Sequence, residues 1–395
     1  MKAIVCSDFD FGNHFKHMSS KDVFKYEEKQ IESFNRFVSK CIEIEPEIIF
    51  IVGNLFGSSK PRNLAIETVR KGLNELADNG MKILILPGAH DVPLPFTNDI
   101  PVHYVFENKN IKFLFTRENT VKLSIEKPIK QMTVGDLRFN IFTMTSPLRN
   151  PTDIEFDLEI DKDSLNLFLL SDVTSFKKNI EKIFVELLKK LDRFEFDAVL
   201  LGGNYPDVPE ISKCGFDIIY CPQIHKNNFL FTQKYHGIKI IEIKNGMIND
   251  TDQIFPISKF NVKNENLDVS GLNSKEINDK IYDIIKKNSD PVNNIMRLTL
   301  VGKLEKQKYH NLKLFQRSEM GKRSNYYFEL FDRIEFVNSS QEIQGLNVKE
   351  ELEDFISKKK TSEPQKIIAE ELKFDIDDVY KECLDLIKNN WEREA

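Results

Sequence analysis

Four short polar segments, each directly after an apolar stretch, carry the residues of this chain whose types could do chemistry. They are SDFDFG (residues 7–12), VGNLFGSSKP (52–61), LPGAHDVP (86–93) and LGGNYPD (201–207). The carboxyl ends of sheet strands are where α/β proteins usually place their chemistry. The third segment is the most informative, because its turn presents His90 and Asp91 together. That turn either does chemistry or is what remains after chemistry was lost.

Alternating apolar and amphipathic stretches predict the elements that must position these segments. Residues 2–7, 47–52 and 82–86 are apolar enough to be buried strands. Between the first two, apolar side chains at helical spacing predict a helix over residues 27–44: Ile31, Phe34, Phe37, Val38 and Cys41. A second helix is expected over residues 62–80, closed by Gly80. This β-α-β-α-β order predicts an α/β fold with a parallel sheet and helices packed on it.

The rest of the chain predicts a second sheet and two further parts. Strands are expected over residues 111–116, 137–144, 165–170, 197–201, 216–221 and 237–243, with a helix over 177–191. The last strands follow one another closely, as in the second sheet of a two-sheet sandwich. The pattern then changes to a helix over 274–288 and a strand over 296–304. We expect a first domain over residues 1–255, a small α/β domain over 256–338 and a helical segment over 345–395.

Composition narrows the class of protein. The 395 residues carry a formal net charge of -6, which argues against a uniformly basic nucleic-acid binder. The chain begins as a strand rather than a signal peptide, and its apolar runs fall far short of the ~18 residues that span a bilayer, so a cytoplasmic protein is expected. The five cysteines are odd in number and lack CxxC spacing, which favours reduced, mostly buried thiols over a metal or redox site.

Local charge is nevertheless uneven. Residues 297–323 contain eight basic and two acidic residues, a net charge of 8 − 2 = +6. Such a segment could bind phosphates, with a solvated strand face as the alternative interpretation. The candidate nucleic-acid contacts are Lys303, Lys306, Lys308, Lys313, Arg317, Lys322 and Arg323.

In order and spacing, the four polar segments resemble the loops of the calcineurin-like metallophosphoesterases, and most closely the SbcD-like double-strand-break repair nucleases. The loops of that family read roughly S-D-x-H-L-G, G-D-L-F-x-x-S-x-P, G-N-H-D and G-H-x-H. GNLFGSSKP is the most specific match, and YCPQIHKNNF and KYHGIKIIEIKNG are similar to the closing strands. The resemblance covers most of residues 1–255 and implies a two-sheet sandwich flanked by helices. The small following domain is similar, more loosely, to a DNA-capping domain.

The resemblance implies a two-metal centre, in which cations ~3.5–4 Å apart polarise a phosphodiester and generate a bound hydroxide. A bridging carboxylate, with His, Asn and Asp, supplies the ligands. Asp8 matches the first Asp of this set, whereas Asp10 replaces a His and could still ligate. Asn54 replaces the bridging Asp, and Ala89 replaces an Asn.

The remaining ligand positions also differ from the family pattern. Ser171, or Asp172 if the frame shifts by one, stands where a His is expected, and Gly203 and Tyr205 stand at the two His of the last loop. One of seven ligand positions is therefore intact. Even the loss of an outer-shell partner costs ~10–100-fold in metal affinity or activity. Six changed ligand positions should cost far more, so we expect no metal, or only weak Mn²⁺ or Mg²⁺ binding.

Several roles for the surviving polar residues stay open. His90 matches the family's transition-state His, and is either a catalytic remnant or a residue that structures its turn. A single weak ion could bind Asp8, Asp10 and His90. A new metal site could instead combine Asp10 with His14 and Asp172.

The leading hypothesis is a catalytically degenerate SbcD-like subunit that scaffolds a DNA double-strand-break repair complex. Its partners would be DNA, an SMC-like coiled-coil ATPase, and either a second copy or an active paralogue, with no membrane. The alternative is an active, divergent metal-dependent nuclease or phosphodiesterase with rewired ligands, so enzyme activity stays open. A relative of the small subunits of replicative polymerases is disfavoured, because the chain starts directly with the phosphoesterase strand.

The last 45 residues favour a protein partner over DNA. Residues 351–395 contain thirteen acidic and eight basic residues. The segment is similar to a helix-turn-helix, but Asp377, Asp378 and Glu382 on its second helix would repel phosphates. An apolar face is expected to bury against a partner's helix, or else against this chain's own domain: Ile376, Val379, Cys383 and Ile387.

Overall fold

The structure, a computed structural model, divides into two compact units, Met1–Val301 with Leu312–Arg333, and Gly302–Asn311 with Ile334–Ala395. It describes residues 1–92, 102–115, 124–125, 127–145, 155–158, 160–171, 180–203, 214–225, 229, 236–244 and 246–337. The expected domain boundaries at residues 255 and 338 stay predictions. The expected partner-binding face of Ile376, Val379, Cys383 and Ile387 lies outside the described residues, as do Asp172 and Tyr205.

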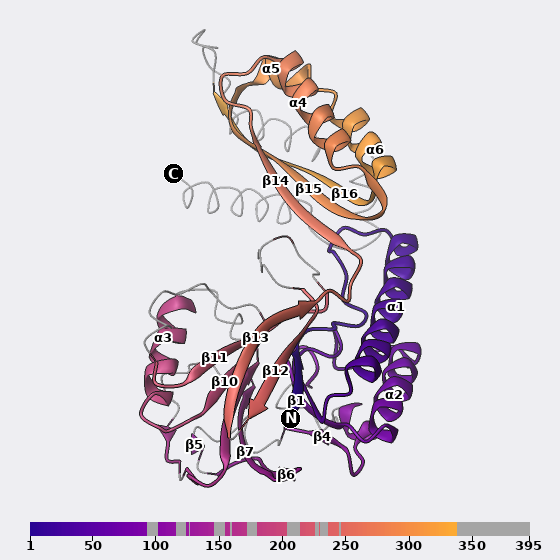
Figure 1. Ribbon diagram of the computed structural model, residues 1–395. Helices are drawn as coiled ribbons and strands as arrows, with labels where there is room; N and C mark the ends of the chain where they lie inside the picture. Colours follow the sequence, from indigo (N-terminus) through magenta and orange to yellow (C-terminus); the bar gives the residue numbers. More distant parts are fainter. Residues whose placement is uncertain are drawn as a thin grey trace, which may run out of the picture. The chain divides into compact units, whose positions relative to one another are not determined.

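A six-stranded sheet in the first unit supports three of the four polar segments (Figure 1). Its parallel strands are β1 (Lys2–Cys6), β2 (Ile48–Gly53), β3 (Lys82–Pro87) and β4 (Ile111–Phe113). Because both faces of this sheet are covered, every residue of β2 is buried. Since β1, β2 and β3 are parallel, the loops that follow them start from the same edge of the sheet.

The strand expected over residues 237–243 belongs to this first sheet and not to the second. It is β12 (Ile238–Lys244), which pairs antiparallel with β1 and places Ile240 opposite Ile4. A hairpin partner, β13 (Met247–Phe255), extends the sheet beyond β12. The close spacing of the last strands therefore marked a return to the first sheet.

A second, five-stranded sheet packs face to face on the first. It contains β6 (Lys130–Val134), β7 (Leu137–Thr145), β9 (Leu165–Ser171), β10 (Ala198–Gly202) and β11 (Asp217–Cys221). Phe50 and Val52 of the first sheet share one buried cluster with Leu167, Leu169 and Leu200 of the second. This interface is the central apolar layer of the fold.

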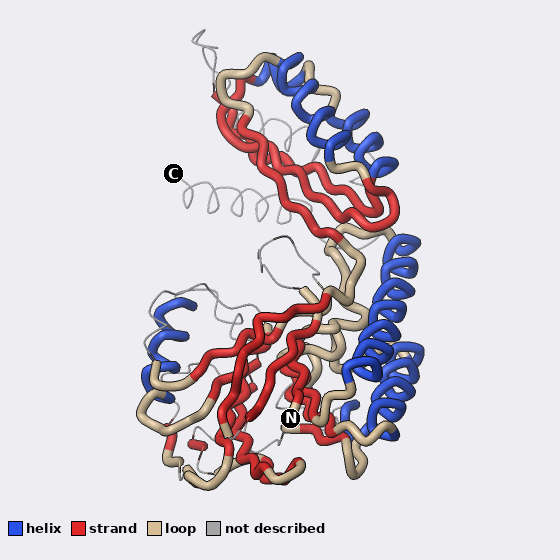
Figure 2. Tube along the Cα trace, in the orientation of Figure 1, coloured by secondary structure: helices blue, strands red, loops and turns tan. Residues whose placement is uncertain are grey.

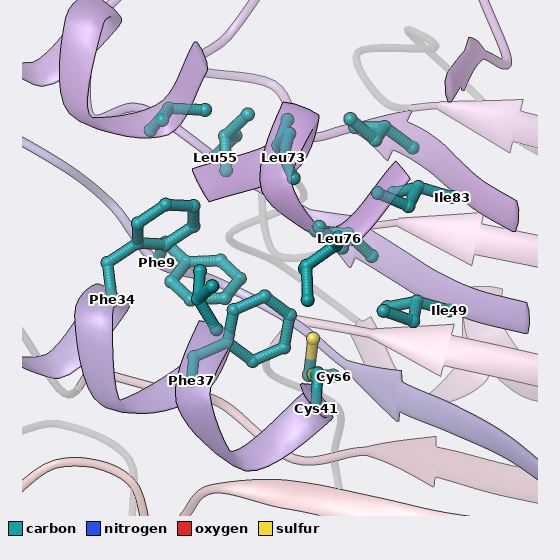
Figure 3. Close-up of a cluster of buried hydrophobic side chains, with 14 of the residues drawn as sticks. Cys6, Phe9, Phe34, Phe37, Cys41, Ile49, Leu55, Leu73, Leu76 and Ile83 are labelled. Atoms are coloured by element: carbon teal, nitrogen blue, oxygen red, sulfur yellow. The ribbon is translucent and has the colours of Figure 1, made fainter. Parts of the chain in front are cut away.

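Helices cover the outer faces of both sheets. On the first sheet, α1 (Ser20–Ile44) and α2 (Asn63–Asp78) lie side by side (Figure 2). Their apolar side chains pack on the sheet in the cluster drawn in Figure 3, with Phe34 and Phe37 of α1 beside Phe9. On the second sheet, α3 (Ile180–Leu191) buries Leu187 and Leu191. The expected α/β class is confirmed, with α1 beginning at Ser20, two turns earlier than predicted.

The chain after β13 forms a three-stranded sheet with helices. The strands are β14 (Asn261–Asp268), β15 (Asp290–Glu305) and β16 (Asn325–Val337). The longer helices are α4 (Ser274–Lys287) and α6 (Leu314–Ser324), which contact each other, and α5 (Lys306–His310) is a short helix. The helix expected over residues 274–288 is α4, and Asn273 and Glu276 form a capping box at its start.

Three short elements complete the description. They are η1 (Val102–Phe106), β5 (Ser124–Ile125) and β8 (Glu155–Phe156). Among the described residues, no helix is long and apolar enough to cross a membrane. The described cysteines are free thiols, of which Cys6, Cys41 and Cys221 are buried.

Candidate functional site

Main-chain hydrogen bonds join the loops that follow β1, β2 and β11. Ser7 N–H donates to Pro222 O at 2.8 Å, and Ile224 N–H donates back to Ser7 O at 2.9 Å. On the other side, Asp10 N–H donates to Asn54 O and Phe11 N–H donates to Leu55 O, each at 3.1 Å. The candidate residues of distant loops are thereby brought together at one edge of the first sheet.

Asp8 is the centre of this arrangement. Its carboxylate is buried, with the residue 2% exposed, and its backbone adopts a positive φ of 45°. Oδ1 accepts hydrogen bonds from the main-chain N–H of Asn54 at 2.9 Å and from its side-chain Nδ2 at 3.3 Å. Oδ2 accepts from Gln223 Nε2 at 2.8 Å. Three amide donors therefore surround the charge that the family pattern would place against a metal ion.

Asn54 connects this carboxylate to the loop after β3. Its side-chain Oδ1 accepts a hydrogen bond from the main-chain N–H of His90 at 3.0 Å. Gly88 allows this approach, because a Cβ there would lie 2.1 Å from Asn54 Oδ1. The Asn54 side chain thus donates to Asp8 and accepts from the GAHD turn, and it adds no negative charge.

The two neighbours in the GAHD turn have separate roles. Asp91 is fully buried, and its carboxylate accepts from the main-chain N–H groups of Phe56 at 2.6 Å, Leu55 at 2.7 Å and Gly88 at 3.2 Å. His103 Nε2 lies 3.5 Å from its Oδ2. Asp91 therefore fastens the loop after β2 to the loop after β3 and is a structural residue of the turn.

His90 points the other way. Its side chain is 52% exposed, and Nδ1 lies 3.8 Å from Asp10 Oδ1. The ring of His14 contacts the main chain, with Nδ1 3.2 Å from Phe15 O. Within the described ranges, no three His, Cys, Asp or Glu side chains form a group that could hold a metal ion. A single ion on Asp8, Asp10 and His90 stays a prediction, and the site with Asp172 includes a residue outside those ranges.

Gln223 and His225 belong to this site, although the sequence interpretation did not place them there. It had matched the family's last loop to LGGNYPD. In the structure, the described part of that loop ends at Gly203, and Gly202 packs against β2, where a Cβ would lie 1.5 Å from Val52 O. The contacts with Asp8 come instead from the PQIH segment after β11, through the side chain of Gln223 and the main-chain N–H of His225. The available signal was the segment YCPQIHKNNF, which contains Gln223 and His225 and is similar to the closing strands of the family.

His225 is held in an environment that disfavours its charged form. The residue is buried, and its main-chain N–H donates to Asp8 O at 3.1 Å. Burial lowers the pKa of His225 to about 3, with the positive charges of Arg36 and His236 acting in the same direction. The imidazole is therefore neutral across the ordinary pH range.

The side chains present do not fit a two-metal centre. Ser171, at another expected ligand position, is buried and its hydroxyl donates to Pro87 O at 2.7 Å. Both Asp8 oxygens accept amide hydrogen bonds, and Ala89 has no donor atom. Two divalent cations need anionic and imidazole ligands aimed at them, and Asn54 supplies a neutral amide where the bridge would be.

The candidate phosphate contacts lie on β15, α5 and α6, with Lys313 directly before α6, and several carry an acidic neighbour. Lys308 pairs with Glu305 at 2.9 Å, and Lys322 pairs with Glu319 at 2.8 Å. The guanidinium of Arg317 lies 5.1 Å from the centre of the Tyr282 ring. The seven candidates do not belong to a single compact unit: Lys303, Lys306 and Lys308 are part of one, and Lys313, Arg317, Lys322 and Arg323 are part of the other.

Arg297, counted in the basic segment, is committed to a buried ion pair. Its Nε and terminal nitrogen donate to Glu329 Oε2 at 2.7 and 2.6 Å. The guanidinium lies between the rings of Phe229 and Phe331, at 4.3 and 4.5 Å from their centres. Tyr327 OH donates to the second Glu329 oxygen at 2.6 Å. Arg297 is therefore unavailable to a phosphate.

Comparison with known proteins gives partial matches. Over 62 residues, 16% of this chain, it is 37% identical to the DNA double-strand break repair protein Mre11 of Methanococcus maripaludis. Over 76 residues, 19% of the chain, it is 29% identical to the DNA double-strand break repair protein Mre11 of Methanocaldococcus jannaschii. The matches span 17% and 21% of the lengths of these two relatives. No protein-family model matches the chain.

Proposed function

We propose that this chain is a catalytically degenerate, calcineurin-like subunit of a DNA double-strand-break repair complex. In this role it acts as a scaffold for DNA and for an SMC-like coiled-coil ATPase. Support for a role in DNA double-strand-break repair comes from the partial similarity to two proteins named Mre11. Support for the architecture comes from the two packed sheets, with helices on both outer faces.

One observation carries the degenerate part of the proposal: the amides of Asn54 and Gln223 occupy both oxygens of Asp8. Of the other carboxylates near the turn, Asp91 accepts hydrogen bonds from three main-chain N–H groups. Asp10 is the third carboxylate of these loops, with Oδ1 3.8 Å from His90 Nδ1, and it supplies too little negative charge for two divalent cations. Hydrolysis by a metal-bound hydroxide requires those cations, so a scaffold role suits the site better than catalysis.

The scaffold would use surfaces other than the Asp8 cluster. Exposed cations on β15, α5 and α6 would meet DNA phosphates, which makes DNA binding salt-dependent. The acidic, apolar-faced segment over residues 345–395 would bind the ATPase coiled coil. Pairing with a second copy or with an active paralogue would complete the complex.

A pull-down with the matching SMC-like ATPase tests the scaffold role. The full chain should retain the ATPase, and Ile376→Glu with Val379→Glu should abolish retention. Lys381→Ala, in the same segment but not one of the four residues of the expected apolar face, is the control and should leave retention unchanged. Failure of the full chain to retain the ATPase at any salt concentration would reject the scaffold.

A second candidate function rests on the accessibility of His90. Its half-exposed ring lies 3.8 Å from an Asp10 oxygen, an arrangement that a single-metal phosphodiesterase could use. This candidate predicts Mn²⁺-dependent cleavage of DNA or of a phosphodiester, lost in both Asp8→Ala and His90→Ala. Cleavage that is absent from the full chain, or unchanged in both variants, would exclude it.

A further inference from the structure

We infer that neutral side-chain amides have taken over the structural role of metal ions in this fold. Asn54 and Gln223 close around the Asp8 carboxylate and form an amide lock (Asp8, Asn54 and Gln223). The lock holds loops from four strands together without a cation. It concerns the integrity of the site and is independent of which partner or nucleic acid the chain binds.

The amide lock joins loops that follow strands of both sheets. Asp8 follows β1, Asn54 follows β2 and Gln223 follows β11. The loop after β3 joins through the main-chain N–H of His90, which donates to Asn54 Oδ1. Every donor in this chain of bonds is an amide, so the arrangement carries one negative charge and needs no ligand from solution.

Two glycines let the main chain pack closely against the side chains of Asp8 and Asn54. A Cβ at Gly53 would lie 2.6 Å from Asp8 Oδ1, and the positive φ of 131° at Gly53 also favours glycine. A Cβ at Gly88 would lie 2.1 Å from Asn54 Oδ1. The backbone of two loops therefore approaches the carboxylate and the amide as closely as glycine permits. A cation entering beside Asp8 Oδ1 would have to displace Asn54 from this close fit.

A third amide extends the same principle to the loop that carries Asp10. Gln30 of α1 is fully buried, and its Nε2 donates to Asp10 O at 3.0 Å and to Asn13 O at 3.1 Å. Its Oε1 accepts from Gly12 N–H at 3.1 Å. This loop is thus also fixed by a neutral side chain.

The test uses Gln223→Glu in the full chain, followed by thermal unfolding in EDTA and in Mn²⁺. The new carboxyl group is as large as the amide of Gln223. In its ionised form it cannot donate a hydrogen bond, and it is a second buried negative charge beside Asp8. The melting temperature of this variant should fall by about 4–10 °C in EDTA and recover in millimolar Mn²⁺, which can bind between the two carboxylates. The unsubstituted protein should melt at the same temperature in both solutions.

Gln253→Glu is the matched control, because Gln253 is exposed on β13 and has no place in the lock. It should melt like the unsubstituted protein in both solutions. If Gln223→Glu does not fold, Gln223→Met supplies the second measurement: it removes the donor without adding charge, and should lower the melting temperature without Mn²⁺ recovery.

Two results would overturn the amide lock. One is destabilisation of the unsubstituted protein by EDTA, or its stabilisation by Mn²⁺, which would mean that a metal still holds the loops. The other is a melting temperature for Gln223→Glu or Gln223→Met equal to that of Gln253→Glu. Neither result depends on ATPase or DNA binding, so the lock and the scaffold can fail separately.

Discussion

Two buried clusters in this chain each hold a carboxylate, but with different kinds of donor. Asp8 is surrounded by neutral amides from loops, whereas Glu329 is held on a sheet by the guanidinium of Arg297 and the hydroxyl of Tyr327. The first cluster keeps a net negative charge, and the second is neutral overall. A buried carboxylate can therefore be stabilised either by several dipoles or by one matched ion, and substitutions in the two clusters should have different effects on stability.

The largest expected loss comes from Arg297→Met, which leaves Glu329 buried without its counter-ion. Breaking a buried ion pair from one side costs about 3–5 kcal/mol, which we expect as the drop in the free energy of unfolding in urea. Arg333→Met, an exposed position on β16, is the control. Adding Glu329→Gln to Arg297→Met should recover part of the loss, and a cost below about 1 kcal/mol for Arg297→Met would contradict the ion-pair account.

Acid should lower the free energy of unfolding through His225, which lies in the Asp8 cluster. The unfolded chain protonates this His below a pKa of 6.5, but burial keeps the folded-state pKa at about 3. Protonation therefore favours the unfolded chain. The free energy of unfolding should fall as the pH drops below 6.5, by up to about 1.4 kcal/mol per pH unit.

His225→Asn isolates this contribution when urea unfolding is compared at pH 7, 6 and 5. The variant should show a flatter pH dependence than the unsubstituted protein. His310→Asn, at an exposed position of α5, should keep the original slope. Identical slopes for all three proteins would mean that His225 titrates normally.

Asn54→Ala should have an intermediate effect on stability. It removes one donor to Asp8 and the acceptor of the His90 N–H, while the main-chain N–H of residue 54 still reaches Asp8. Leaving these buried groups without partners costs about 1–3 kcal/mol, measurable by urea unfolding. Asn249→Ala, on the exposed edge of β13, should cost less than about 0.5 kcal/mol. An equal cost at both positions would remove Asn54 from the lock.

His90→Ala should have the smallest effect, within about 0.5 kcal/mol of the unsubstituted protein. Its ring is half-exposed, and its contribution to the lock comes from the main chain, which the substitution keeps. Urea unfolding measures this directly. A large loss would assign the ring a structural role that its exposure does not indicate.

Local patterns in the sequence were sufficient for the core of the first sheet. The apolar runs of β1, β2 and β3 and the helical spacing of α1 and α2 predicted the parallel order. Since the carboxyl ends of parallel strands share an edge, this order also brought Asp8, Asn54 and the GAHD turn together. The α/β class and the proximity of these residues therefore followed from the amino-acid pattern.

The features that the sequence did not predict depend on long-range pairing of strands or on strands rich in polar residues. Gln223 reaches Asp8 only because β11 ends beside β1, a contact across 215 positions that no local spacing encodes. The strand β13 is an edge strand with the sequence MINDTDQIF, in which exposed acidic and amide side chains hide the apolar alternation. The structural role of Asp91 was also missed, because the three main-chain N–H groups that donate to its carboxylate leave no mark in the side-chain sequence.

The pairing of β1 with β12 bears on how the chain is made. Met1 and Ile243, which are hydrogen-bonded across this pair, stand 242 positions apart. At a synthesis rate of ~5–20 residues per second, β1 waits about 10–50 s for the strand that covers its open side. Throughout that interval an apolar strand offers unpaired N–H and C=O groups to other chains. The open side of β1 is therefore a site for unwanted strand pairing while the chain is being made.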